Sequence, residues 1–141
     1  MRQKIGLFTF GVNNLQKSVA FYTALGWKLS SYSTGDLVVF SMGNTALCLY
    51  PRRGLAEDAC VDPAGSGFSG VTVSFFAKSI KEVDEIMAEV QVLGAEIAKS
   101  PQKALWGGYS GYFKDPDGYL IEVAYNPFWP LEEDGSLKPP T

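Results

Sequence analysis

The sequence predicts an α+β fold made of two βαβββ modules, and three observations support this. The chain has 141 residues, which is the size of a single domain. Apolar residues make up 46% of it, enough to fill a core. The two halves of the chain also share one order of elements, because each opens with a strand, a helix and a glycine and closes with two strands around a tight turn.

The first module covers about residues 4–50 and opens with the apolar run Ile5–Val12, which is typical of a strand. Asn13 and Asn14 are candidate N-caps for the helix that follows. Gly26 can adopt the left-handed conformation that ends a helix. The predicted helix repeats apolar side chains at helical spacing, at Leu15, Val19 and Tyr22.

Two further strands are expected to close the first module, at Leu37–Phe40 and Thr45–Tyr50. They flank the turn-forming sequence Ser-Met-Gly-Asn. The next segment, residues 51–69, is rich in Gly, Pro and Asp, so we expect a linker that forms a surface loop.

The second module covers about residues 70–127 and opens with the predicted strand Gly70–Phe76. Ser79 and Glu82 have the spacing of a capping box at the start of a helix, and Gly94 is placed to end it. The apolar face of this helix consists of Ile80, Val83, Met87 and Val90.

The second module is expected to close with strands at Tyr109–Phe113 and Tyr119–Tyr125. Asp115 and Asp117 lie in the turn between them and are predicted to form that turn rather than a catalytic pair. The segment Lys99–Lys103 contains a proline and is expected to be a solvated loop.

The C-terminal tail, residues 128–141, places Phe128 and Trp129 between prolines. We expect an extended segment held by these two aromatic rings, with the chain from Leu131 onward frayed.

Charge and composition exclude several classes of function. The chain carries 12 basic and 15 acidic residues, a net charge of −3, which does not favour nucleic acid as a partner. It has no histidine, so Ser-His-Asp catalysis and histidine-ligated metal sites are excluded. The two cysteines do not form a disulfide framework, and Ile5–Val12 is too short to span a membrane. We therefore expect a cytoplasmic protein without a membrane partner.

Two motifs resemble a known family. The opening FTFGVNNLQKSVAFYTALGWK and the later GYFKDPDGYLIEVAYNP are similar to the vicinal oxygen chelate superfamily, which includes glyoxalase I, bleomycin-resistance proteins, fosfomycin-resistance enzymes and extradiol dioxygenases. The resemblance runs from about Ile5 to Pro127. It implies a U-shaped sheet of antiparallel and mixed pairing around a cavity, with the helices on the outer face.

In metal-dependent members, the resemblance implies four ligands, one from the first and one from the last strand of each module. The corresponding positions here hold Leu7, Cys48, Val71 and Glu122. Only Glu122 offers a hard oxygen ligand, and one carboxylate with one thiolate falls short of a catalytic site. We therefore expect no metal ion and no cofactor.

Glu122 is the candidate catalytic residue and a candidate ligand-binding residue. On the alternating strand LIEVAY it lies opposite Ile121 and Val123, so it points into the cavity if those two meet the helix. It acts either as a binding or base carboxylate, or as a former ligand position that a neighbouring hydroxyl satisfies. Cys48 is read as a small buried hydrophobe or, less favourably, as a nucleophile.

The other candidate ligand-binding residues are Thr9, Trp106, Tyr109 and Tyr112. Thr9 lies two residues after Leu7 and offers a hydroxyl on the same strand face. The aromatic side chains suit the walls of a cavity, although core or interface packing explains them equally well. Whether Tyr112 or Phe113 faces the cavity depends on the length of the turn after them.

The sequence favours a protein that binds a small amphipathic or aromatic molecule without a metal ion over an enzyme. The alternative is a lyase, isomerase or dioxygenase-type enzyme of the same superfamily that uses Glu122. A homodimer is also expected, because closed two-fold dimers are the commonest assembly.

Overall fold

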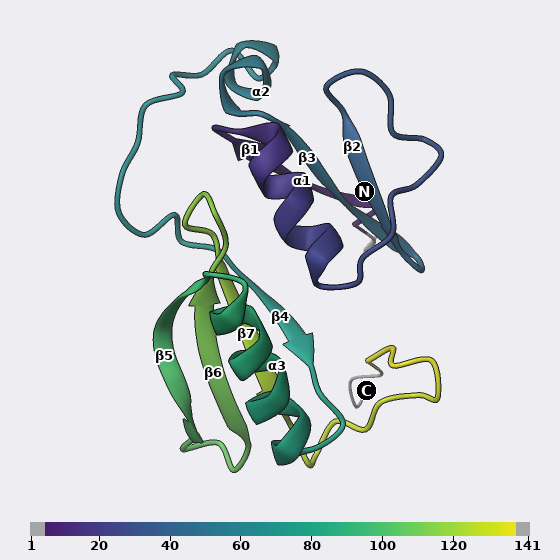
Figure 1. The fold of residues 1–141 in the computed structure, drawn as a ribbon, viewed down its shortest axis with the longest axis vertical. Helices are drawn as coiled ribbons and strands as arrows, with labels where there is room; N and C mark the ends of the chain where they lie inside the picture. Colours follow the sequence, from purple (N-terminus) through teal and green to yellow (C-terminus); the bar gives the residue numbers. More distant parts are fainter. Residues whose placement is uncertain (1–4, 138–141) are drawn as a thin grey trace. The chain divides into compact units, whose positions relative to one another are not determined.

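A computed structural model describes residues 5–137 of the chain. It divides after Gly67 into two compact units, and each is described by itself. Both units consist of a small mixed sheet with helices, as the predicted α+β fold requires (Figure 1). Within the described residues, no helix combines the length and hydropathy needed to cross a membrane.

The first unit contains the strands β1 (Leu7–Val12), β2 (Val38–Met42) and β3 (Thr45–Pro51) and the helices α1 (Leu15–Ala24) and α2 (Arg52–Asp58). The strand order is β1-β3-β2. β3 runs parallel to β1 and antiparallel to β2. The expected order of strand, helix and paired strands is therefore confirmed.

The helix α1 begins and ends as the sequence predicts. The side chain of Asn14 accepts a hydrogen bond of 2.9 Å from the amide of Lys17, and Gly26 has a φ of +87°. The ring of Tyr22 is buried and stacks on Trp27 at 5.0 Å between centroids. It also lies 5.9 Å from the ring of Phe40 on β2, so these rings tie the helix to the sheet.

Two features of the first unit differ from the expectation. The segment predicted as a loop after Pro51 contains α2, which buries Ala56 and carries an Arg53–Glu57 ion pair of 3.1 Å. Because Arg53 and Glu57 are four residues apart, they meet on one side of the helix. In addition, an isolated bridge between Leu29 and Phe40 takes the place of the fourth strand of the module.

The second unit contains the strands β4 (Thr72–Phe76), β5 (Glu96–Lys103), β6 (Tyr109–Lys114) and β7 (Leu120–Tyr125) and the helix α3 (Ile80–Val92). The strand order is β4-β7-β6-β5. β4 and β7 are parallel, whereas the other neighbours are antiparallel. This is the complete predicted module.

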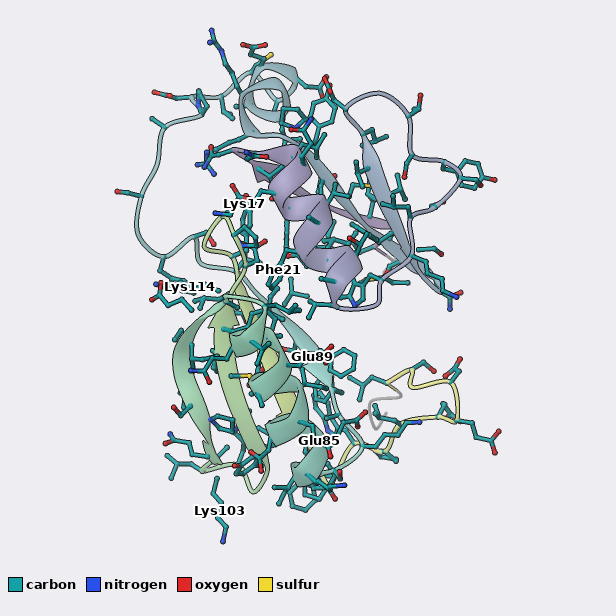
Figure 2. The ribbon with its side chains drawn as sticks, in the orientation of Figure 1. Lys17, Phe21, Glu85, Glu89, Lys103 and Lys114 are labelled. Carbon is teal, nitrogen blue, oxygen red and sulfur yellow. The ribbon has the colours of Figure 1, made fainter. Side chains whose placement is uncertain are left out.

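The helix α3 packs on one face of this sheet and has the predicted cap. The hydroxyl of Ser79 accepts a hydrogen bond of 3.1 Å from the amide of Glu82. A Cβ on Gly111 of β6 would lie 3.0 Å from the end of Met87, so Gly111 marks the face that α3 covers. Glu85 and Glu89 lie on the exposed side of the helix (Figure 2).

The turn between β6 and β7 is confirmed. One carboxylate oxygen of Asp115 accepts hydrogen bonds of 2.9 Å from the amides of Asp117 and Tyr119, and Gly118 has a φ of +86°. The side chain of Asp115 therefore stabilises the turn through these two hydrogen bonds, as the sequence predicts.

The prediction of a solvated loop at Lys99–Lys103 is wrong, because this segment forms the second half of β5. β5 is an edge strand whose register shifts twice against β6. An edge position tolerates Pro101, which is why the proline does not prevent a strand here. Lys103, at the end of β5, projects away from the sheet (Figure 2).

The tail also differs from the expectation of fraying. Leu131 and Leu137 form a bridge, and the amide of Glu132 donates a hydrogen bond of 3.0 Å to the carbonyl of Ser136. Residues 131–137 therefore form a closed turn. The remaining tail residues, 138–141, and the first residues of module one lie outside the described residues.

Candidate functional site

The face of the second sheet opposite α3 carries a cluster of polar side chains. Tyr112 on β6 pairs with Glu122 on β7, and Glu122 pairs with Ser74 on β4. Paired residues on neighbouring strands point to the same side of a sheet. Ile121 and Val123 are buried on the opposite side, where α3 lies, so Glu122 occupies the open face as predicted.

Glu122 lies between two hydroxyl-bearing neighbours, Ser74 on β4 and Tyr112 on β6. The hydroxyl of Ser74 donates to a carboxylate oxygen of Glu122 at 2.7 Å. Burial raises the pKa of Tyr112, and its hydrogen bond to Glu122 and the charge of that carboxylate raise it further. Tyr112 therefore keeps its proton to a higher pH than an ordinary tyrosine does. The ammonium of Lys99 lies 5.8 Å from the centre of the Tyr112 ring.

A pocket of about 480 Å³ opens beside this cluster. Small-molecule sites typically have volumes of about 300–1,000 Å³ and combine apolar walls with a few polar groups. This pocket likewise combines apolar, mainly aromatic walls with a few polar side chains. Its lining residues are Ser74, Phe76, Trp106, Glu122, Ala124, Asn126, Phe128 and Trp129.

Two glycines allow the aromatic walls to approach the backbone. A Cβ on Gly108 would lie 1.7 Å from ring atom Cζ3 of Trp106 and 2.6 Å from the carbonyl oxygen of Tyr125. A Cβ on Gly107 would lie 2.9 Å from the ring of Phe128. Glycine at both positions is therefore needed for the rings to lie where they do.

The tail supplies the rest of the aromatic wall. The rings of Trp129 and Phe76 lie 6.1 Å apart between centroids, within the range of an aromatic contact. Trp129 is 38% exposed and Phe128 is 64% exposed, so both rings present surface that a ligand can cover. Residues of β4, of β7 and of the segment that follows β7 therefore all contribute to the wall of the pocket.

The structure brings together some of the predicted site residues. Glu122 and Trp106 line the pocket, and Tyr112 lies beside Glu122. The choice between Tyr112 and Phe113 is settled, since Phe113 is buried on the side of α3.

Tyr109 does not join this group. Its hydroxyl donates a hydrogen bond of 2.8 Å to Asp84 on α3, which raises the pKa of Tyr109. Its position in the alternation of β6 differs from that of Tyr112, so it lies on the helix side.

Thr9 and Cys48 belong to the first unit and pair with each other across β1 and β3. They share one face of that sheet. Cys48 is only 1% exposed, and burial raises the pKa of its thiol. A buried thiol with a raised pKa is a poor nucleophile, so the reading of Cys48 as a small buried hydrophobe fits the structure.

Several lining residues were missed by the sequence analysis. Ser74 could not be predicted as a site residue, because its position beside Glu122 follows from the parallel register of β4 and β7. Val71, which the resemblance sets at a ligand position on the first strand of this module, precedes β4. Phe128 and Trp129 lie between two prolines in the sequence, which indicated an extended segment held by its aromatic rings. The sequence did not indicate that these two rings line a pocket.

The residues at the four positions where the resemblance implies metal ligands do not together offer the donor set of a divalent site. The side chains of Leu7 and Val71 have no donor atom, Cys48 is buried, and Glu122 already accepts a hydrogen bond from Ser74. Across residues 5–137, no three histidine, cysteine or acidic side chains gather as metal ligands do. A divalent site in a protein commonly requires three ligands or more.

Comparison with known proteins agrees with this fold. Residues 4–123 match the model of the family described as the Glyoxalase/Bleomycin resistance protein/Dioxygenase superfamily. The chain is 27% identical over 120 residues to the metallothiol transferase FosB of Shouchella clausii, covering 84% of this chain and 77% of that protein.

Two solved structures are also similar. A glyoxalase-related enzyme from Fulvimarina pelagi superposes with a TM-score of 0.88 at 26% identity, covering 99% of this chain and all of the other. A lactoylglutathione lyase from Agrobacterium tumefaciens superposes with a TM-score of 0.70 at 25% identity, covering 94% of this chain and all of the other.

Proposed function

Because this chain belongs to the glyoxalase/bleomycin resistance protein/dioxygenase superfamily, we propose that the pocket of its second unit binds a small amphipathic or aromatic molecule without a metal ion. One observation carries the proposal. A carboxylate that accepts a hydrogen bond from Ser74 lies at a pocket whose walls are aromatic. Such a site recognises an apolar body and one polar group.

The donor set supports binding without a metal ion. Named relatives include a metallothiol transferase and a lactoylglutathione lyase, so enzymes are present among the proteins that this chain resembles. Here the ligand positions offer one carboxylate and one buried thiol, which is too few for a catalytic divalent ion.

A second candidate is an enzyme that uses Glu122 as a base. The observation that favours it is the pairing of a proton donor, Tyr112, with a proton acceptor, Glu122, beside the pocket. A lyase or isomerase needs such a pair to move a proton within its substrate.

A ligand screen with matched variants tests the proposal. Small aromatic and amphipathic compounds are screened by thermal shift, and affinities are then measured by calorimetry. We expect Trp106→Ala to weaken binding because the ring forms a wall of the pocket. Leu105→Ala is the control, since Leu105 is fully exposed next to Trp106 and should bind as the wild type does.

Glu122→Gln separates binding from catalysis. For a binding protein, the loss in affinity should be no more than about 1–3 kcal/mol, the range for a hydrogen bond to a charged group. For a base, binding would survive while turnover fell by about 10²–10⁴-fold, and this outcome would favour the enzyme. Chelation of divalent ions should leave binding unchanged. A tightly held metal that is lost from Glu122→Gln would contradict the proposal.

We also propose a cytoplasmic location. Cys48 and Cys60 are both free thiols, which suits a reducing compartment.

A further inference from the structure

We propose that the ligand of this pocket is an organic cation, an ammonium group carried on an apolar or aromatic body. The inference rests on the proposed binding function and names the ligand class. It comes from the charge of the pocket and from its aromatic rings.

The charge of the pocket is negative. Among the described residues that line it, Glu122 is the ionisable one, and the others are aromatic, small or amide side chains. Bringing an anion to this carboxylate would be repulsive, and covering it with a neutral group would remove its water without compensation. A cation compensates the charge directly.

Glu122 keeps acceptor capacity for a ligand. A carboxylate has about four lone-pair positions, and the hydroxyl group of Ser74 occupies one of them. An ammonium N–H, or the charge of a quaternary nitrogen, can use the remaining side of the group.

The aromatic rings provide the second part of the recognition. Phe76, Trp106, Phe128 and Trp129 all line the pocket. Cations are attracted to the negative face of an aromatic ring, most strongly to tryptophan, and cages of such rings are a known way to bind ammonium groups. Four rings and one carboxylate in a single pocket therefore match a cation better than they match any other charge.

The charged groups around the pocket agree with this choice. The adjoining cavity, which shares Asn126 and Trp129, is lined by Glu132 and Glu133 against the single cation Lys78. Lys99 is held over the ring of Tyr112, at 5.8 Å from its centre, rather than against the aromatic wall. The charged residues that line the two cavities are thus mostly carboxylates.

Three probes of one shape test the inference: benzyltrimethylammonium, its neutral carbon analogue neopentylbenzene, and the anion phenylmethanesulfonate. Their affinities are measured by calorimetry and by quenching of tryptophan fluorescence in the full chain. We expect the cation to bind about tenfold or more tightly than the neutral analogue, and the anion to bind most weakly.

Glu122→Gln should lower the affinity for the cation to that for the neutral analogue. The affinity for the neutral analogue should stay as in the wild type. Glu89→Gln is the matched control, because it removes the same charge from the exposed side of α3 and should keep the preference. If the neutral or anionic probe binds at least as tightly as the cation, or if Glu122→Gln keeps the preference, this inference is wrong while the binding function stands. If none of the three binds, the binding function and the inference both fall.

Discussion

The ring of Trp106 lies directly over the backbone of Gly108, at a place where any side chain would occupy the same space. A Cβ on Gly108 would meet ring atoms Cζ3 and Cη2 at 1.7 and 2.0 Å. One wall of the pocket therefore depends on the absence of a side chain two residues further along the chain.

Gly108→Ala is expected to push Trp106 out of its place and to lower ligand affinity. The nearby carbonyl of Tyr125, at 2.6 Å, cannot move aside easily, so the free energy of unfolding should fall as well. Tryptophan fluorescence, calorimetry and urea unfolding measure the three effects. Gly6→Ala is the control, since nothing lies within 4 Å of its added Cβ. A Gly108→Ala variant with wild-type affinity would show that the ring has no part in binding.

Stability at alkaline pH should depend on Tyr112. Its pKa in the folded protein is raised by burial and by Glu122, above the value of about 10 in an unfolded chain. The contribution of Tyr112 to the free energy of unfolding is therefore complete below pH about 10. It is lost as the pH rises through the pKa of Tyr112 in the folded protein. Urea unfolding between pH about 9 and 11 should show a smaller fall in stability for Tyr112→Phe than for the wild type.

Glu122→Gln provides a second measurement, because it removes the charge that opposes the phenolate. Ultraviolet titration should then show Tyr112 ionising at lower pH than in the wild type. An unchanged titration would mean that Glu122 does not act on Tyr112. Tyr109→Phe is the comparison, since the raised pKa of Tyr109 has another cause, its hydrogen bond to Asp84.

The two thiols should react at different rates. Cys60 is exposed, whereas Cys48 is buried and its pKa is raised. A thiol reagent should modify Cys60 rapidly in the native protein and Cys48 only after unfolding. Cys60→Ser should then lack the fast reaction. Rapid modification of Cys48 in the native protein would restore it as a candidate nucleophile.

We expect the chain to form a homodimer in solution. Only 19% of its residues are charged, and several large apolar side chains are exposed in each unit, including Leu7, Phe75 and Phe128. Light scattering at micromolar concentration should give about twice the mass of one chain, 15.3 kDa. A mass of one chain that persists on concentration would contradict the expectation.

Most elements of the fold could be predicted because their signals are local. Asn14, Gly26 and Ser79 mark helix ends through their own backbone and side-chain preferences, and the structure uses all three in this way. Pro101 misled the prediction, because a proline forbids a central strand but is tolerated at an edge, and edge position is a property of the whole sheet.

The site was predictable only in part, for the same reason. The alternation of β7 placed Glu122 on the open face, but its partner Ser74 depends on which strand lies beside β7 and in which direction it runs. Tyr109 and Tyr112 look alike in the sequence, and their roles separate only when the sheet assigns one to α3 and the other to Glu122. A single sequence does not show which of its distant segments pair with each other.

The irregular strand β5 protects the second sheet from growing at that edge. An exposed edge strand offers unpaired amides and carbonyls to any other chain, which is a common route to aggregation. Pro101 has no amide hydrogen to donate, and the two register shifts interrupt the regular spacing that an incoming strand would need. Addition of a foreign strand at the β5 edge is therefore disfavoured, so this sheet should not capture a designed β5-like peptide.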